Sequence, residues 1–380
     1  MKIAHISDLH LGKIVYNYSM LDDQKAMLAS VASILKENDV KTLLIAGDVY
    51  DKSVPPAEAI KFFDEFIVRL AKAGVQVCMI GGNHDSNERI SFGADLMELG
   101  GVHIAKPLDK NTKDITPVVL QDEFGPVNVY MLPFIKPVHV RVAFDQADIT
   151  SYTEAVKTVI DNMHVDTSAR NILITHQFVT GGERCESEQI SVGGSDNVDS
   201  SVFEPFDYVA LGHLHGPQHI GRETVRYCGS PLKYSFSEVN HKKSVTIITF
   251  NQKGDLKLDF VPVKPLKDWQ EIRGTYQTLM SDEFRAALNT QNYFRVTLTD
   301  EEDVPNAIEK LRTVYPNIMQ LGYDNKRTAY NAQVGTLEQA ESKTPFEIFA
   351  EFYQKQNNQE LNEQQTKYVH DLIETIWEEK

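Results

Sequence analysis

The chain contains 380 residues, a length that suits two domains or one large domain with additions. Hydrophobic residues make up 42% of it and charged residues 24%, a globular composition that excludes a disordered or fibrous protein. The formal net charge is −16, from 38 Lys and Arg against 54 Asp and Glu. This acidic excess argues against a protein that coats DNA or anionic membranes with a basic surface.

No apolar run reaches the roughly 18 residues that a membrane span needs, and the first residues read as a strand rather than a signal peptide. We therefore expect a cytoplasmic protein with no membrane partner. Three widely spaced cysteines, Cys78, Cys185 and Cys228, indicate neither a disulfide framework nor a zinc knuckle.

Short apolar runs alternate with helical patterns along the first 265 residues. The predicted strands are 2–6, 42–46, 76–80, 127–132, 171–175, 208–211, 225–228, 245–250 and 257–263. The predicted helices are 20–37, 57–73 and 153–163. This order predicts an α/β fold, a two-sheet core flanked by helices, with functional loops at the C-terminal ends of the strands.

The remaining residues predict three further parts. Residues 266–330 read as a small βαβαβ domain with strands at 271–274, 293–298 and 318–323 and helices at 279–288 and 304–314. Residues 331–344 are a predicted linker. Residues 345–380 contain two predicted helices, 345–356 and 361–379, the first opened by Thr344 and Pro345.

Five short polar motifs stand where predicted strands end. They are Asp8-Leu9-His10, Gly47-Asp48, Gly82-Asn83-His84-Asp85, Thr175-His176 and Gly212-His213-Leu214-His215. Carboxylate, amide and imidazole donors without thiolate suit Mn²⁺, Fe²⁺ or Zn²⁺. Seven candidate ligands are too many for one tetrahedral ion and favour two ions that share a carboxylate, an arrangement typical of phosphoester hydrolysis.

In this order the motifs resemble those of the calcineurin-like metallophosphoesterase superfamily. Four longer segments resemble, within it, the SbcD family of bacterial DNA nuclease subunits: HISDLHLGK, AGDVYDKSVPP, GGNHDS and YCGSPLKYSFSE. The resemblance covers residues 1–265 with specific motifs. In outline it extends to residues 266–330, similar to the family's capping domain, and to residues 345–380, similar to its partner-docking helices.

The resemblance implies a role for each motif residue. One metal ion would be held by Asp8, His10, Asp48 and His215, and a second by Asp48, Asn83, His176 and His213. Asp48 would be the bridge and His84 the catalytic histidine at the scissile phosphate, with Mn²⁺ as the metal. Archaeal and eukaryotic relatives place another histidine three residues after the bridging aspartate, where this chain has Asp51.

Other residues are candidates for supporting roles. Asp85 and His5 are predicted to orient the ligands from behind. Lys13, Tyr16 and Arg89 are candidate DNA contacts, the alternatives being an exposed loop and a surface ion pair.

The family resemblance also implies partners. Phe349, Phe352, Leu372 and Ile376 are predicted to dock the coiled coil of an SbcC-like ATPase, the alternative being packing on their own domain. A homodimer within a heterotetramer is expected, with 51–68 and 85–99 as the candidate two-fold surface.

The predicted function is a two-metal DNA nuclease in DNA repair, recombination and replication. It would be an exonuclease on double-stranded ends and an endonuclease on single-stranded or hairpin DNA. The alternatives are a small-substrate phosphodiesterase or phosphatase on the same core, and a non-catalytic scaffold.

Overall fold

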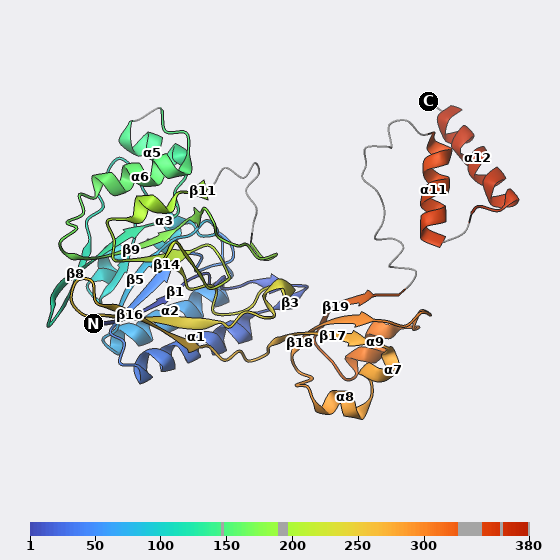
Figure 1. The fold of residues 1–380 in the computed structure, drawn as a ribbon, viewed down its shortest axis with the longest axis horizontal. Helices are drawn as coiled ribbons and strands as arrows, with labels where there is room; N and C mark the ends of the chain where they lie inside the picture. The colour runs from blue at the N-terminus through green and yellow to red at the C-terminus, as the bar shows by residue number, and fades with distance from the viewer. Residues whose placement is uncertain (146–147, 189–196, 326–343, 358–359, 379–380) are drawn as a thin grey trace. The chain divides into compact units, whose positions relative to one another are not determined.

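The computed structural model describes residues 1–145, 148–188, 197–325, 344–357 and 360–378 (Figure 1). The chain divides into two compact units, Met1–Trp269 and Gln270–Lys380. Within the described ranges, no helix combines the length and the apolar character needed to cross a membrane.

Two six-stranded sheets form the framework of the first unit. In spatial order, the first sheet contains β16 (Leu256–Pro262), β15 (Ser244–Phe250), β1 (Lys2–Ile6), β4 (Thr42–Ala46), β5 (Gln76–Ile80) and β6 (Val102–Ile104). The second contains β13 (Gln218–Ile220), β14 (Arg222–Tyr227), β12 (Tyr208–Gly212), β9 (Arg170–His176), β8 (Gly125–Leu132) and β7 (Val118–Asp122). Strands β1, β4 and β5 are parallel, as are β8, β9 and β12, so the ends of neighbouring strands meet at one edge of each sheet.

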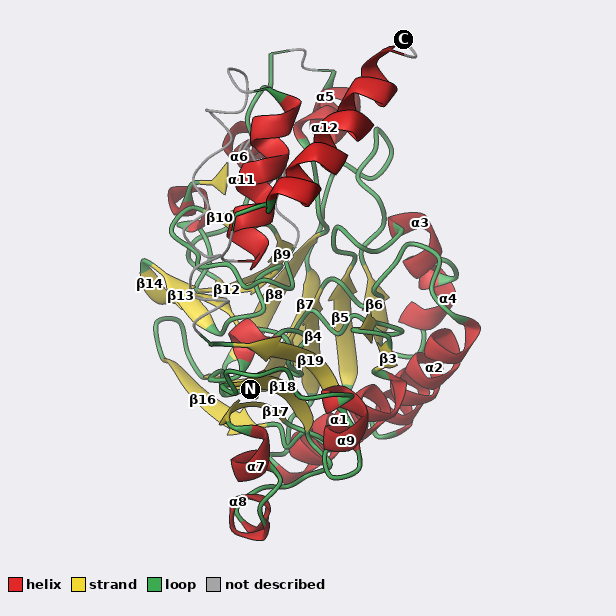
Figure 2. Cartoon of the chain, turned by 90° about the vertical axis from the view of Figure 1, so that its right-hand side faces the viewer, coloured by secondary structure: helices red, strands yellow, loops and turns green. Residues whose placement is uncertain are grey.

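The sheets pack face to face, and helices cover their outer faces. Leu44 and Cys78 of the first sheet share a buried cluster with Ile172 and Ala210 of the second. Helices α1 (Leu21–Glu37) and α2 (Ala57–Lys72) lie on one side of the strands, and α5 (Pro137–Phe144) and α6 (Tyr152–Asn162) lie on the other (Figures 1 and 2). Because both strand faces are buried, the central strands read as continuous apolar runs. The predicted two-sheet core flanked by helices is confirmed.

Several short elements were not predicted, because runs of two to five residues carry no readable period. They are β2 (Ile14–Val15), β3 (Tyr18–Ser19), α3 (Asn87–Ile90), α4 (Ala94–Glu98), β10 (Phe178–Val179), β11 (Asn197–Val198) and the 3₁₀ turns η1 (Ser200–Phe203) and η2 (Phe236–Glu238).

A buried ion cluster ties the two sheets together. The guanidinium of Arg170, on β9, pairs with the carboxylate of Asp122 at the end of β7 and also donates to the backbone carbonyl of Asn251. The amino group of Met1 lies 2.9 Å from the same carboxylate. Arg170 lowers the pKa of Asp122 well below its usual range, so the pair stays ionised.

The second unit contains a three-stranded sheet, ordered β17 (Trp269–Gly274), β18 (Tyr293–Leu298) and β19 (Ile318–Tyr323). Helices α7 (Tyr276–Leu279), α8 (Asp282–Ala286) and α9 (Ala307–Arg312) connect the strands. Phe294, Val296, Leu311 and Tyr315 form its core.

Two helix predictions in this unit were wrong in extent. The single helix predicted over 279–288 is two short helices, because the Ser281 hydroxyl accepts from the backbone N–H of Phe284 and starts α8 as a new N-cap. The helix predicted over 304–314 begins only at Ala307, because Asn306 takes a left-handed backbone conformation with φ of 53°.

Two helices, α11 (Pro345–Asn357) and α12 (Glu363–Glu378), stand where two were predicted. Residues 331–343 of the predicted linker lie outside the described residues. The domain boundaries drawn from the sequence stay a prediction.

Candidate metal centre

The candidate site lies in the loops that follow β1, β4, β5, β9 and β12. Four of the predicted ligands in these loops have positive φ: Asp8 at 54°, His10 at 44°, Asp48 at 49° and His213 at 107°. Non-glycine residues rarely adopt such angles, and the strain persists only where the surrounding structure imposes it. Strained, buried polar residues on rigid strand ends are typical of a functional site.

Three glycines keep room for these side chains. A Cβ on Gly82 would lie 2.1 Å from Oδ1 of Asp48, and one on Gly47 would lie 2.5 Å from Nδ1 of His176. A Cβ on Gly212 would lie 1.8 Å from the Ala46 carbonyl oxygen. The glycines of the GD, GN and GH motifs therefore allow loops from both sheets to approach each other closely.

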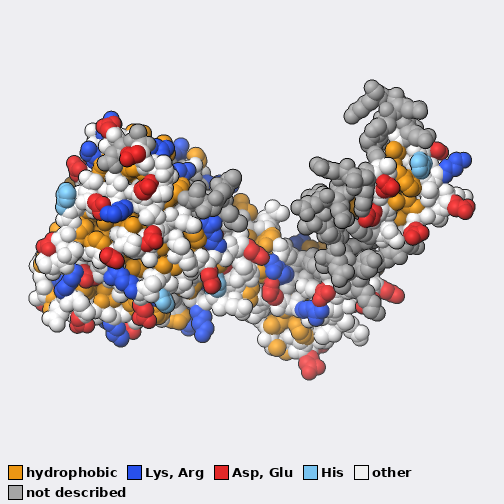
Figure 3. All heavy atoms as spheres, turned by 45° about the horizontal axis from the view of Figure 1, so that its top comes forward, with side chains coloured by type: hydrophobic (Ala, Val, Ile, Leu, Met, Phe, Trp, Pro, Cys, Tyr) orange, Lys and Arg blue, Asp and Glu red, His pale blue; other side chains and the backbone are white. Residues whose placement is uncertain are grey.

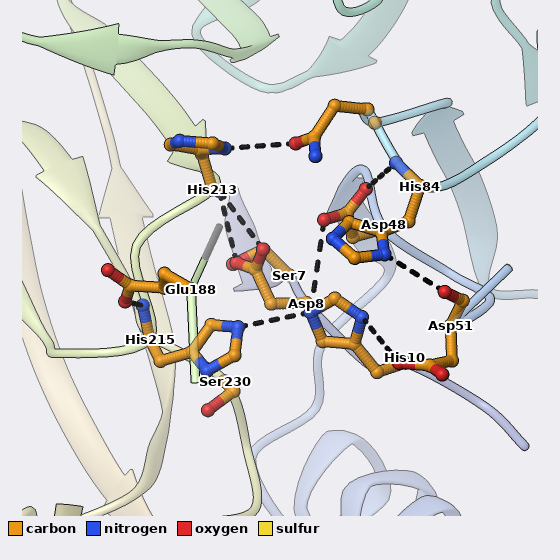
Figure 4. Close-up of polar contacts among 12 residues, drawn as sticks. Ser7, Asp8, His10, Asp48, Asp51, His84, Glu188, His213, His215 and Ser230 are labelled. Atoms are coloured by element: carbon orange, nitrogen blue, oxygen red, sulfur yellow. Dashed lines mark hydrogen bonds and ion pairs between the residues drawn. The ribbon is translucent and has the colours of Figure 1, made fainter. Parts of the chain in front are cut away.

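Asp8, His10 and His215 converge on one side of the site (Figure 4). The Nε2 atoms of His10 and His215 lie 3.0 Å apart. Asp8 accepts a hydrogen bond from Ser7 Oγ at 2.5 Å, and its Oδ1 accepts from the backbone N–H of His213 at 3.0 Å. These contacts fix the carboxylate while the two imidazoles face each other.

Asp48, His176, Asn83 and His213 lie on the other side. His176 Nε2 is 3.4 Å from Asp48 Oδ2 and 3.0 Å from Asn83 Oδ1, and His213 Nδ1 is 2.9 Å from the same amide oxygen. His176 Nδ1 lies 2.8 Å from the Ala46 carbonyl oxygen and must donate to it, because a carbonyl only accepts. Its Nε2 is thereby left as the nitrogen that faces Asp48 and could bind a metal.

Burial and mutual charge shift the pKa values of these groups. Burial raises the pKa of Asp8 and lowers that of His10 well below its usual range. Burial also opposes charge on Asp48 and His176, but their attraction for each other prevails. It holds the pKa of Asp48 well below its usual range and raises that of His176 to about 9.

The donor set fits divalent cations. Ligand atoms of Asp8, His10 and His215 lie within 4.8 Å of one another, and so do those of Asp8, Asp48 and His176. A third group contains His10, Asp48 and His84. Because the groups share members, they form one continuous cluster of buried carboxylates and imidazoles. A cation placed there would relieve the close approach of the His10 and His215 nitrogens and the burial of two acids.

His84 and Asp85 follow β5 and contact the same loops. The backbone N–H of His84 donates to Asp48 Oδ1 at 2.9 Å, and its ring Nδ1 donates to the Asp51 carbonyl oxygen at 2.9 Å. Asp85 accepts from the backbone N–H groups of Val49, Tyr50 and Gly82 at 2.9–3.0 Å. The Asp85 carboxylate thus ties the loop of Asp48 to the loop of Asn83.

The other predicted site residues lie farther from this cluster. His5 Nδ1 contacts the Tyr208 hydroxyl at 3.0 Å between the sheets. Lys13 forms an ion pair with Asp51 at 2.6 Å, and the ring of half-exposed Tyr16 lies 5.9 Å from that of Phe236. Arg89 is exposed and lines a pocket beside Phe92.

The predicted partner-docking residues lie on α11 and α12. Phe349, Phe352 and Leu372 are exposed, whereas Phe346 stacks on His370, with ring centroids 4.5 Å apart. The side chain of Ile376 lies outside the described part of the chain.

Sequence reasoning missed the residues that contact His215. Its Nδ1 lies 2.7 Å from Ser187 Oγ, and its backbone N–H donates to Glu188 at 2.5 Å. Glu238 lies next to Ser187, within the segment YCGSPLKYSFSE that carried part of the resemblance. That segment was a signal for Glu238. Ser187 and Glu188 stand in the loop 180–198, whose richness in Gly, Ser and Glu suggests an active-site loop but singles out neither residue.

Comparison with known proteins places this site in a family. A family model described as calcineurin-like phosphoesterase matches residues 1–217, and one described as the Type 5 capsule protein repressor C-terminal domain matches residues 264–357. The chain is 32% identical over 383 residues to a Staphylococcus epidermidis protein named as the D subunit of the nuclease SbcCD, covering 99% of both chains.

Two solved structures also match, the protein TT1561 of Thermus thermophilus and a dimetal phosphatase from Danio rerio. They are 12% and 11% identical, cover 69% and 70% of this chain and 99% and 98% of their own, and give TM-scores of 0.40 and 0.43. At these scores they add nothing to the argument. The two family models and the full-length identity suffice: the chain belongs to the calcineurin-like phosphoesterases and, within them, to the SbcD family of nuclease subunits.

Proposed function

We propose that the chain is a metal-dependent DNA nuclease subunit, an exonuclease on double-stranded ends and an endonuclease on single-stranded or hairpin DNA. One observation carries the proposal: a cluster of Asp, His and Asn side chains joins five loops of a chain that matches a named nuclease subunit over 99% of its length. Strained backbone at Asp8, His10, Asp48 and His213 costs folding stability and would bring no benefit to a non-catalytic scaffold that had lost its activity.

We assign the cluster to two divalent ions, and among the metals that this donor set suits, Mn²⁺, Fe²⁺ and Zn²⁺, we propose the Mn²⁺ that the family resemblance implies. Asp8, His10, Asp48 and His215 would hold one, and Asp48, Asn83, His176 and His213 would hold the other. When bound, such a pair clamps a phosphate and lowers the pKa of a water molecule for in-line attack. The contribution of the chain is to fix its ligands in advance, as the contacts of His176 with Ala46 and of Asp8 with Ser7 do.

His84 is the proposed proton donor to the leaving oxygen. Its Nδ1–H is held by the Asp51 carbonyl oxygen, so the ring keeps this hydrogen bond in both the protonated and the neutral form. Loss of the Nε2 proton then leaves a neutral imidazole that needs no reorientation. General acid catalysis of this kind contributes typically 10²–10⁴-fold to a rate.

Hydrolysis of DNA compared with hydrolysis of a small diester tests the substrate assignment. With Mn²⁺, the purified chain should release nucleotides from an end-labelled blunt duplex and cut a hairpin, and Asp48→Asn should abolish both activities. Hydrolysis of bis-p-nitrophenyl phosphate alone, with no cleavage of either DNA, would favour a small-substrate phosphodiesterase instead.

The partner is proposed to be an SbcC-like ATPase that binds α11 and α12. Phe349 and Phe352 lie on one side of α11, 41% and 58% exposed, and Leu372 on α12 is 46% exposed. Aromatic residues exposed at i and i+3 on a helix suit a helix-in-groove contact. The double substitution Phe349→Ser with Phe352→Ser should abolish binding of the ATPase, while Gln354→Ala on the same helix should not. Unchanged binding of the ATPase by the double variant would show that these helices do not form the interface.

A homodimer is proposed through the surface around α3 and α4. Phe92, Leu96 and Leu99 are 85%, 76% and 86% exposed, a concentration of large apolar side chains that a monomer rarely leaves in water. The neighbouring pocket of about 270 Å³ is lined by Ile60 and Phe63 of α2, which adds apolar surface for a second copy.

DNA affinity is proposed to come mainly from the partner and the bound ions. Residues 1–265 and 266–380 each carry a net charge of −8, from 26 basic against 34 acidic and from 12 basic against 20 acidic residues. On the face of the first unit that Figure 3 shows, basic and acidic side chains are interspersed. The isolated chain should therefore bind DNA weakly, with a shallow dependence on salt.

A further inference from the structure

A series of buried and partly buried polar groups leads away from the outer nitrogen of His215. Ser187 Oγ lies 2.7 Å from His215 Nδ1 and 2.7 Å from Glu238 Oε1. The other oxygen of Glu238 lies 2.5 Å from the ammonium of Lys243, which also donates to the His215 carbonyl oxygen at 2.8 Å. Glu238 and Lys243 are 0% and 7% exposed. This series of polar contacts thus begins and ends at the same residue, His215.

The direction of each hydrogen bond follows from what surrounds Glu238. Its Oε1 also accepts from the backbone N–H of Tyr234 at 3.1 Å and from Ser235 Oγ at 3.0 Å. With Lys243 on Oε2, the carboxyl group is surrounded by donors and is therefore an ionised acceptor. Lys243 holds the pKa of Glu238 well below its usual range against the effect of burial, in agreement with this geometry.

The single proton of Ser187 therefore goes to Glu238, and its oxygen must accept from His215. A serine hydroxyl has one hydrogen, and Glu238 cannot supply one. The contact between Ser187 and His215 is consequently Nδ1–H to Oγ. This leaves Nε2 of His215 without a proton, on the side that faces His10 at 3.0 Å and the ligand cluster.

We propose that Ser187, Glu238 and Lys243 form a positioning relay that fixes the ring and the tautomer of His215 for metal binding. The proposal rests on the proposed function, because it assumes that His215 is a ligand. Carboxylate partners behind metal-binding histidines are a general device, and their removal typically weakens metal binding 10–100-fold. Here a serine from a separate loop stands between the carboxylate and the histidine.

The loop that supplies Ser187 is fastened on both sides of it. The backbone N–H of Glu183 donates to Gln218 at 2.8 Å, and that of Glu186 donates to Ser237 at 3.1 Å. After it, Glu188 accepts from the backbone N–H of His215 and from that of Cys185. The hydroxyl of Ser187 is therefore placed by its own loop as well as by its two partners, as a positioning residue requires.

Two isosteric substitutions test the relay. Threonine and valine at position 187 have the same shape and differ in the hydroxyl group. In isothermal titration of the full, metal-free chain with Mn²⁺, the Ser187→Thr variant should have an affinity close to that of the wild-type chain. The Ser187→Val variant should bind one of its ions about 10–100-fold more weakly and keep the other unchanged. Thermal unfolding of the metal-free variants checks that both are folded.

The outcomes separate the relay from the proposed function. Equal Mn²⁺ affinity of the Thr and Val variants would overturn the relay while leaving the two-ion site in place. If the added methyl group weakens both, Ser187→Ala decides, because it removes only the hydroxyl, and wild-type affinity would again overturn the relay. If the wild-type chain itself bound no Mn²⁺, the proposed function would fail and the relay with it.

Discussion

Substitution of Gly82 by alanine tests whether the site depends on the close approach of its loops. The φ angle of Gly82 does not lie in the left-handed region, so alanine can adopt its backbone conformation. The added Cβ would lie 2.1 Å from Asp48 Oδ1 and 2.5 Å from the Asp48 backbone nitrogen. Since such contacts essentially never fall below about 3.0 Å, Asp48 or the Gly82 loop must move by roughly 1 Å.

A shift of that size would displace Asp48, the residue that the two proposed ions would share. Misplacement of catalytic groups by about 1 Å costs on the order of 10²-fold in rate. Gly82→Ala should therefore lower the Mn²⁺-dependent rate on hairpin DNA and on bis-p-nitrophenyl phosphate about 100-fold. The melting temperature should fall as well, because Gly82 and Asp48 are buried and overpacking a buried contact costs about 1–3 kcal/mol.

Gly322→Ala is the matched control. Gly322 lies on β19 of the second unit, where a Cβ would meet nothing within 4 Å and where φ is likewise not left-handed. Its variant should keep full activity. A Gly82→Ala enzyme within threefold of the wild-type rate would refute the argument that this glycine is required for the geometry of Asp48.

Three other features of the chain can be tested by substitution. His84→Gln should lower the rate on DNA by about 10²–10⁴-fold. If Mn²⁺ affinity, measured by titration, fell equally, His84 would be a ligand rather than a proton donor. Asp122→Asn leaves Arg170 buried without its carboxylate and should destabilise the chain by on the order of 3 kcal/mol at pH 7. Since the folded-state pKa of Asp122 is depressed, its contribution is complete above its unfolded pKa of about 4 and is lost as pH falls below that value. The free energies of unfolding in urea of the wild-type chain and the Asp122→Asn variant should accordingly converge towards acidic pH. A difference between them that stayed constant with pH would contradict the role of the Arg170–Asp122 pair. Phe92→Ser with Leu99→Ser should convert the dimer into a monomer, as measured by light scattering. A wild-type chain that is already monomeric would show that this surface is not a dimer interface.

The apolar pattern of the sequence was sufficient for the layers of the first unit. Strands such as Thr42–Ala46 are buried along their whole length and therefore stand out as short apolar runs between helices. The apolar pattern was not sufficient where a single backbone angle or helix cap determines where an element begins or ends. Asn306 delays the start of one predicted helix, and Ser281 restarts another that the apolar spacing alone would continue.

The candidate site was predictable to the extent that its residues cluster in motifs. Asp8 and His10 follow β1, which pairs in parallel with the strand before Asp48, and His213 and His215 follow β12, which pairs in parallel with the strand that ends at His176. The packing of the two sheets then brings these two sets together. Ser187 contacts His215 across 28 positions and Glu238 across 51, and it stands in a loop with no period. No local rule relates such residues, because their proximity arises only when two loops fold over the same strand end.

The left-handed residues explain why the motifs are so short. Asp8 and Asp48 turn the backbone sharply two residues after their strands end and His10 does so four residues after, so each candidate ligand is aimed across the sheet edge within a few residues. A longer loop could reach the same point without strain, but it would leave the ligand less firmly held. Strain at three positions therefore exchanges folding stability for a fixed donor geometry. On this reasoning Asp48→Gly and Asp48→Ala should both abolish activity, but in the metal-free chain the glycine variant should melt at the higher temperature, because both lack the carboxylate and only glycine relieves the φ of 49°. A glycine variant that melts no higher than the alanine variant would show that strain is not stored at this position.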